Sequence, residues 1–136
     1  MKKSTTPEKG YFLNVTKKQV NKLLVLHILL EQKRGLYGKE IRSLLHEKGF
    51  LEKQELPTYG SFYPLLHEMY EEGLLRREER LMNPDPYEKT YQKVVLYHVT
   101  DKGYEEYQIM KKKFLGFFQR QEQFLTKIYQ KIYNKW

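Results

Sequence analysis

The stretch PTYGSFYPLLHEMYEEGLL, residues 57–75, decides which fold this sequence can adopt. Its apolar residues Leu65, Leu66 and Met69 recur at three- and four-residue steps, which is typical of one face of a helix. Gly73 follows the run and predicts the end of that helix, because glycine readily adopts the left-handed conformation found after a last helical turn. The stretch therefore predicts one short helix with a polar and aromatic first turn.

Pro64 restricts where this short helix begins. A proline in a helix interior removes one backbone hydrogen bond, whereas the first turn has free N–H groups in any case. We therefore expect Ser61 to be the N-cap, which places Pro64 in the first turn. A helix that begins near Thr58 and bends at Pro64 is the alternative.

Two further helices are predicted before this stretch. Residues 16–33 carry apolar residues at helical spacing, with Thr16 as a cap and Gly35 as a stop. Residues 38–48 repeat the pattern more briefly and end at Gly49. The GLYG link between the two helices predicts a sharp turn.

The pattern changes to strands after the short helix. Residues 74–81 and 93–99 predict two strands, the second of which, VVLYHV in its core, gives the clearest strand signal in the chain. The segment between them holds two prolines within three residues, so the pair predicts a long hairpin with a polar tip.

A single long helix is predicted over residues 101–135, opened by Thr100 or Asp101 and about 52 Å in length. Its apolar and aromatic residues form a stripe that a small domain cannot cover over its whole length, so we expect the stripe to pair with a second chain. The expected dimer interface consists of Tyr107, Met110, Phe114, Phe117, Gln121, Phe124, Ile128 and Ile132.

Together these elements predict an α+β, mostly α chain: a winged helix-turn-helix with a long C-terminal dimerisation helix. We expect a flexible basic N-terminal arm over residues 1–10 and a winged-helix DNA-binding domain over residues 11–100. Residues 101–136 are expected to form the helix for homodimer pairing, either antiparallel or parallel.

Composition favours a polyanionic partner. The chain has 136 residues, with 25 Lys and Arg against 17 Asp and Glu, a net charge of +8 and a pI near 9.5. It contains no cysteine, which excludes disulfides and thiolate sites, and its apolar runs are too short to span a membrane. With no secretory signal before Tyr11, we expect a cytoplasmic protein of bacterial type that is associated with the nucleoid when bound.

No pattern in the sequence indicates an enzyme. The four histidines are far apart, no phosphate-binding glycine motif is present, and the adjacent glutamate pairs do not share a helix face. We expect no catalytic residue, no metal site and no cofactor.

Candidate DNA contacts come from three places. In a winged helix the third helix enters the major groove by its N-terminus, where Thr58, Tyr59, Ser61 and Tyr63 offer hydrogen-bonding groups. This turn has no Arg or Lys, so direct reading of guanine from it is weak and specificity is expected from the arm, the wing or DNA shape. The candidate phosphate contacts are Arg76, Arg77, Arg80, Lys89 and Lys93 of the wing, and Lys2 and Lys3 of the arm.

At these residues the sequence resembles the replication terminator protein family. The resemblance runs from about Tyr11 to Tyr133 and rests on LYG at residues 36–38, on FYxxLHEM at residues 62–69 with EGLL after it, and on KVVLY at residues 93–97. The sequence is also similar to the PadR-like transcriptional repressors, through SFYP at residues 61–64 and VTDKG at residues 99–103.

Both families are winged-helix homodimers that pair through a C-terminal helix, and the resemblance implies the same here. It also implies that Thr58, Tyr59, Ser61 and Pro64 face DNA. Pro64 stands where the terminator pattern has a basic residue that contacts DNA, so a different target sequence is expected.

Three functions follow as hypotheses. The first is a sequence-specific double-stranded DNA-binding homodimer that arrests replication forks at terminator sites, where two dimers on adjacent half-sites block a replicative helicase. The second is a PadR-like winged-helix repressor, which implies a small-molecule effector between subunits. The third is an interaction protein whose aromatic coiled coil binds another chain. None of them involves a membrane.

Overall fold

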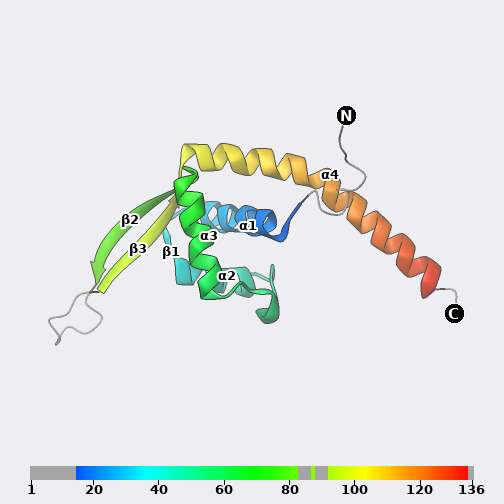
Figure 1. Cartoon of the computed structure of the whole chain (residues 1–136), viewed down its shortest axis with the longest axis horizontal. Coiled ribbons are helices and arrows are strands. Elements are labelled where there is room, and N and C mark those ends of the chain that lie inside the picture. Colours follow the sequence, from blue (N-terminus) through cyan, green and yellow to red (C-terminus); the bar gives the residue numbers. More distant parts are fainter. Residues whose placement is uncertain (1–14, 83–86, 88–91, 135–136) are drawn as a thin grey trace.

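The computed structural model describes residues 15–82, 87 and 92–134. Their elements, in chain order, are α1 (Lys17–Gln32), β1 (Leu36–Tyr37), α2 (Gly38–Glu47), the 3-10 turn η3 (Lys53–Glu55), α3 (Tyr59–Glu71), β2 (Leu75–Met82), β3 (Gln92–Val99) and α4 (Asp101–Ile132). The predicted order of three helices, a hairpin and a long helix is confirmed (Figure 1). Within the described ranges, no helix has the length and apolar composition to cross a membrane.

The sheet has three antiparallel strands in the order β1-β3-β2. The predicted hairpin pairs along its length, from Leu75 opposite Val99 to Met82 opposite Gln92. The third strand, β1, lies in the link that was expected to be only a turn, where Leu36 pairs with Tyr97. A strand of two residues is too short to produce an alternating pattern, so the sequence carries no signal for it.

The core lies between the sheet and the helices, with α1 at its centre. Figure 1 shows the first half of α4 passing above α1 and α2 lying below α1, while α3 runs from the level of α2 up to the start of α4 and the wing projects to one side. The side chains that pack this core come from every helix and strand of the fold. Those buried completely include Val25, Ile28, Leu36, Ile41, Leu45, Phe62, Leu66 and Met69.

The helix predicted over residues 16–33 is found as α1, but its stop residue differs from the prediction. The left-handed C-cap is Lys33, with φ 57°, and not Gly35. Gly35 has another use, because a Cβ atom there would lie 2.4 Å from Cε1 of the His98 ring. This glycine therefore lets β3 pack closely against the link after α1.

The two halves of α4 have different environments. Tyr107, Met110 and Phe114 are buried against the rest of the same chain, with Phe114 only 1% exposed. The Tyr107 hydroxyl lies 2.6 Å from Nδ1 of His27 on α1, and burial raises the pKa of this hydroxyl, so it keeps its proton. The expectation that these three residues belong to a dimer interface is corrected, because α1 already covers them.

A network around Thr100 joins the end of α3 to the start of α4. The Thr100 hydroxyl donates to the carbonyl of Gly73 at 2.6 Å, and its backbone N–H donates to the carbonyl of Leu74 at 3.1 Å. The same hydroxyl caps α4 by accepting from the N–H of Gly103 at 3.0 Å. We call this network the Thr100 clasp.

Ion pairs fasten α1 to α3 on the outside of the core. Lys22 lies 3.0 Å from Glu72 and also contacts Glu68, which in turn lies 2.6 Å from Lys18. Hydrogen bonds from Lys18 and Lys22 hold the pKa of Glu68 below its usual value. Burial alone would lower the pKa of Lys22, but its bonds to the two glutamates outweigh burial and raise it. Lys22 and Glu68 therefore keep their charges near neutral pH.

Replacing two glycines of α4 by alanine should have opposite effects on stability, because one glycine lies in the Thr100 clasp and the other lies on an open part of the helix. A Cβ atom at Gly103 would lie 2.2 Å from the Leu74 carbonyl oxygen, so Gly103→Ala should lower the free energy of unfolding by about 1–3 kcal/mol. At Gly116 the nearest atom is the far end of the Arg120 side chain at 3.3 Å, so Gly116→Ala should raise it by up to about 1 kcal/mol. Urea denaturation measures both, and a stabilising Gly103→Ala would contradict the close approach.

Candidate nucleic-acid interface

The start of α3 is the first correction at the predicted site. Thr58, and not Ser61, is the N-cap, because its side chain accepts from the Ser61 N–H at 3.2 Å. The earlier start, which was the alternative, places Pro64 inside the helix and leaves the Gly60 carbonyl without its usual donor. Gly60 and Pro64 are both exposed, so that carbonyl can be solvated and the extra turn is tolerated.

One face of α3 is exposed and aromatic. Tyr59, Tyr63, His67 and Tyr70 follow each other at steps of four and three residues, and we call them the aromatic row. The Tyr59 and Tyr63 rings are stacked with centroids 5.9 Å apart, and those of His67 and Tyr70 lie 6.1 Å apart. The buried residues of α3, which are Phe62, Leu65, Leu66 and Met69, lie on another side of the helix and pack in the core, so the row stays exposed.

An arginine from another element lies at each end of the aromatic row. Arg42 of α2 places its guanidinium 4.3 Å from the centre of the Tyr59 ring. Arg77 of β2 places its guanidinium 5.3 Å from the centre of the Tyr70 ring. Such stacking is a favourable cation–π contact, and it brings positive charge to a helix whose first turn has none. Arg77 was a predicted site residue, whereas Arg42 was not.

Two of the candidate wing cations form ion pairs with glutamates of the same hairpin. Arg80 lies 3.0 Å from Glu78, and Lys93 lies 3.2 Å from Glu79. Bonds from His98 and Arg80 hold the pKa of the Glu78 carboxyl below its usual value, so that side chain stays negative. Exposed ion pairs of this kind are weak and can exchange for phosphate.

The strand register separates the wing cations into two faces. Arg77 lies opposite Tyr97 and shares its face with Lys93, toward α3. Arg76 and Arg80 lie on the other face of the hairpin, because side chains alternate along a strand. The structure therefore brings Arg77 and Lys93 to the aromatic row and leaves Arg76 and Arg80 away from it.

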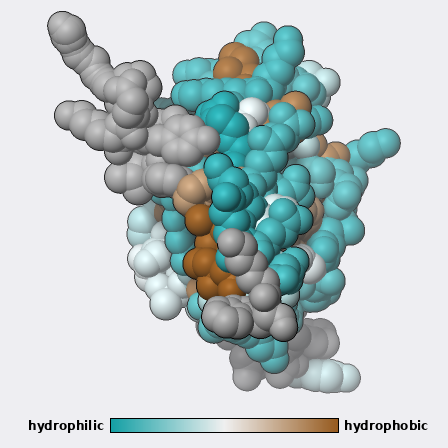
Figure 2. Space-filling view, turned by 90° about the vertical axis from the view of Figure 1, so that its right-hand side faces the viewer, coloured by the Kyte–Doolittle hydropathy of each residue, from teal (hydrophilic) through white to brown (hydrophobic). Residues whose placement is uncertain are grey.

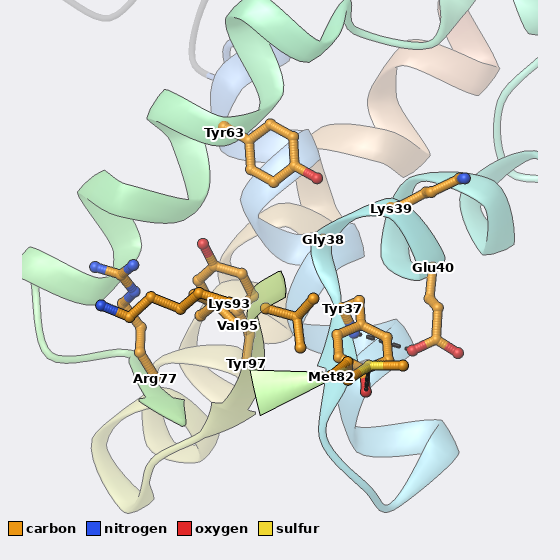
Figure 3. Close-up of a pocket in the computed structure, with 11 residues that line it drawn as sticks. Tyr37, Gly38, Lys39, Glu40, Tyr63, Arg77, Met82, Lys93, Val95 and Tyr97 are labelled. Carbon is orange, nitrogen blue, oxygen red and sulfur yellow. Dashed lines mark hydrogen bonds between the residues drawn. The ribbon is translucent and has the colours of Figure 1, made fainter. Parts of the chain in front are cut away.

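A cavity of about 570 Å³ opens between the N-terminus of α2, α3 and one face of the wing (Figure 3). Tyr37, Tyr63 and Tyr97 line it from three different elements, and Arg77 and Lys93 add positive charge on the wing side. Burial raises the pKa of the Tyr97 hydroxyl, which therefore remains a neutral donor. The cavity can accept an anionic or hydrogen-bonding group that approaches beside α3.

Three predicted contacts, Lys2, Lys3 and Lys89, lie outside the described residues. Of the others, Ser61, Pro64 and Arg76 are exposed, as a contact with a large ligand requires. Over the residues that the structure describes, no three acidic or histidine side chains are grouped so that they could hold a metal ion.

Comparison with known proteins identifies the family. The model of the replication terminator protein family matches residues 11–133. The chain belongs to the replication terminator protein family. The resemblance read from the sequence is thereby confirmed, and this terminator-family chain has no match among curated proteins.

Solved structures share the fold of this terminator-family chain. A PadR-like transcriptional regulator from Bacillus cereus is 29% identical with a TM-score of 0.57, covering 79% of this chain and 93% of that one. A PadR family transcription regulator from Clostridium difficile is 22% identical with a TM-score of 0.57, covering 76% and 96%. F93 from STIV, a winged-helix DNA-binding protein, is 25% identical with a TM-score of 0.52, covering 71% and 88%. None of these names is that of an enzyme.

The corrected cap of α3 predicts unequal effects of two small substitutions. Thr58→Ala should lower the free energy of unfolding by about 1 kcal/mol, because it removes the acceptor of the Ser61 N–H. Ser61→Ala should change it much less, because the exposed Ser61 hydroxyl only accepts from Thr58 at 3.3 Å. Equal losses in urea denaturation, or a larger loss for Ser61→Ala, would contradict the assignment of Thr58 as the cap.

Proposed function

We propose that the protein is a homodimer that binds a specific site on double-stranded DNA, with α3 in the major groove and the wing against the phosphate backbone. The observation that carries this proposal is the exposed aromatic row, which lies between Arg42 and Arg77 on a helix whose other face forms the core. A helix held in this way can enter a groove without unfolding, and its exposed groups can approach base edges.

The chemistry of the aromatic row suits this ligand. Tyrosine hydroxyls donate to phosphate oxygens, and the ring faces can pack against thymine methyl groups. The cavity beside Tyr63 adds hydroxyl groups and two cations within reach of a backbone that passes between α3 and the wing. With a net charge of +8, the chain favours this ligand at long range as well.

The second half of α4 supports the proposal that two copies pair. The helix has 32 residues against 16 in α1, so α1 can cover only about half of its length. Beyond Phe114 the apolar stripe continues on the same side of the helix and leaves Leu125 61% exposed and Tyr129 58% exposed. Figure 1 shows this half extending past the body, and Figure 2 shows one strip of hydrophobic surface between hydrophilic areas at that end.

We call the exposed apolar stripe beyond Phe114 the distal stripe. A second copy of this chain is the partner that the distal stripe favours. Each large apolar side chain removed from water contributes about 1.5–3 kcal/mol, so several together can hold two chains. The residues proposed for the interface are Phe117, Gln121, Phe124, Ile128 and Ile132, as predicted from the sequence, with Phe118, Leu125 and Tyr129 added by their exposure.

Membership of the replication terminator family makes fork arrest the first candidate for the biological role. In that role, two dimers on adjacent half-sites would block a replicative helicase. Transcriptional repression is the second candidate, favoured by the 29% identity with a PadR-like transcriptional regulator, and it would add a small-molecule effector. Either role places the protein in the bacterial cytoplasm, on the nucleoid.

The dimer proposal predicts the effect of one charged substitution. Ile128→Glu should convert dimers to monomers in light scattering and weaken binding to a two-half-site duplex by at least tenfold, because it places a charge within the distal stripe. Gln123→Glu adds the same charge on the opposite side of α4 and should leave a dimer. Unchanged dimers for Ile128→Glu would reject this interface.

The two biological roles are separated by the location of the bound DNA. Crosslinking and sequencing of DNA bound in cells should give several sites in the terminus region if the protein arrests forks. It should give one site beside a promoter if the protein is a repressor. A fork-progression assay on a plasmid that carries a recovered site then tests arrest directly, and arrest in neither orientation would remove the first candidate. Absence of any selective site would overturn the DNA-binding proposal itself.

A further inference from the structure

Arg42 occupies an unusual position for a residue of α2. Its side chain leaves that helix and reaches the turn before α3, where Nε donates to the carbonyl of Pro57 at 2.7 Å. The face of the same guanidinium lies over the Tyr59 ring, at 4.3 Å from its centre. Two contacts in different directions therefore fix both the place and the plane of this group.

The terminal nitrogens of Arg42 remain available. Among the described residues, none accepts a hydrogen bond from Nη1 or Nη2, and no acidic side chain pairs with this guanidinium. Neither atom is among the buried groups without a partner, so solvent satisfies them. The guanidinium is thus half-buried on one side and presents a free donor edge on the other.

Tyr59 in turn is held by its neighbours. Its ring is stacked on Tyr63, with 20° between the ring planes. Tyr63 rests on Gly38, where a Cβ atom would lie 2.6 Å from Cε1 of the tyrosine ring. A series of contacts thus connects the backbone of α2 to the Tyr63 ring, the Tyr63 ring to the Tyr59 ring, and the Tyr59 ring to the guanidinium of Arg42.

We propose that Arg42 reads a guanine in the major groove, with Nη1 and Nη2 donating to its O6 and N7 atoms, and that Tyr59 is the positioning residue for this contact. The proposal rests on the DNA-binding function proposed above and adds to it the cation that the first turn of α3 lacks. Paired donation from one guanidinium to guanine is the commonest specific contact between proteins and DNA.

The fixed plane of the guanidinium favours a base edge over a phosphate. A phosphate accepts a cation from many directions, and the exposed lysines and arginines of this chain already supply such charges. A guanine edge accepts two parallel hydrogen bonds in one plane only, so an arginine oriented in advance loses less entropy when it binds there. The bond to Pro57 and the stack on Tyr59 supply that orientation.

The test begins with the site that the wild-type dimer selects from random duplexes. Each base pair of that site is then replaced in turn, and the affinity of each duplex is measured for the wild type, Arg42→Gln, Arg42→Lys, Tyr59→Leu and Tyr59→Phe over the same series of salt concentrations. We expect Arg42→Gln to remove roughly 5- to 150-fold of discrimination at one G·C pair and to leave discrimination at the other positions unchanged.

The remaining variants separate positioning from charge. Arg42→Lys keeps the charge but cannot donate in a fixed pair, so it should lose discrimination at the same G·C pair. Tyr59→Leu keeps Arg42 and removes its aromatic platform, so it should lose part of that discrimination, whereas Tyr59→Phe keeps the ring and should retain it. Circular dichroism and urea denaturation establish that each variant is folded before binding is measured.

Two results would overturn the inference. If Arg42→Gln lowers the affinity for all duplexes by the same factor and reduces the salt dependence by about one phosphate contact, Arg42 binds the backbone and not a base. If every variant keeps the wild-type preference at each position, Arg42 has no part in recognition. A wild-type protein that selects no site would instead remove the proposed DNA-binding function, a result that is distinct from either of these.

Discussion

Thr100 connects the end of α3 with the start of α4, the helix that extends away from the body. Its hydroxyl and N–H bind the two carbonyls that follow α3, and the same hydroxyl caps α4. Gly103 allows the backbones to approach, because any larger residue would meet the Leu74 carbonyl. The direction of α4 is thereby fixed relative to α3, so two copies that pair through α4 would also hold their two α3 helices in a defined relation.

The exposed face of α3 obtains its positive charge from other elements. Arg42 comes from α2 and Arg77 from β2, and each rests on a tyrosine of the aromatic row. The helix itself provides flat, rigid rings, while the arginines provide charge at defined places. Because the wing glutamates pair with Arg80 and Lys93, positive charge next to the row is concentrated on these two arginines more than the composition alone would indicate.

The order of elements was predictable because apolar spacing and capping residues are local signals. Contacts between distant residues carried no such signal. The Arg42 bond to Pro57 joins residues 15 apart in sequence, and it could not be inferred from the helical pattern of α2. Phe114 was assigned to a partner chain because a periodic stripe shows that a face is covered but not by which element. Pro64 caused the start of α3 to be predicted too late in the chain. The missing N–H of this proline costs little free energy, because the Gly60 carbonyl that it leaves without a donor can be solvated.

The apolar stripe of α4 packs against the body of the chain in its first half and is exposed in its second half. Both halves of the stripe lie on the same side of the helix, so they share one helical phase. A single residue inserted near Gly116 would rotate the distal half by about 100° and turn its stripe away from the side set by Phe114. Seven inserted residues would nearly restore the phase and lengthen the helix by about 10.5 Å. That length corresponds to about three base pairs of duplex. If two copies pair through the distal half, as proposed, a seven-residue insertion would move the pairing surface outward by about 10.5 Å while turning it by only about 20°.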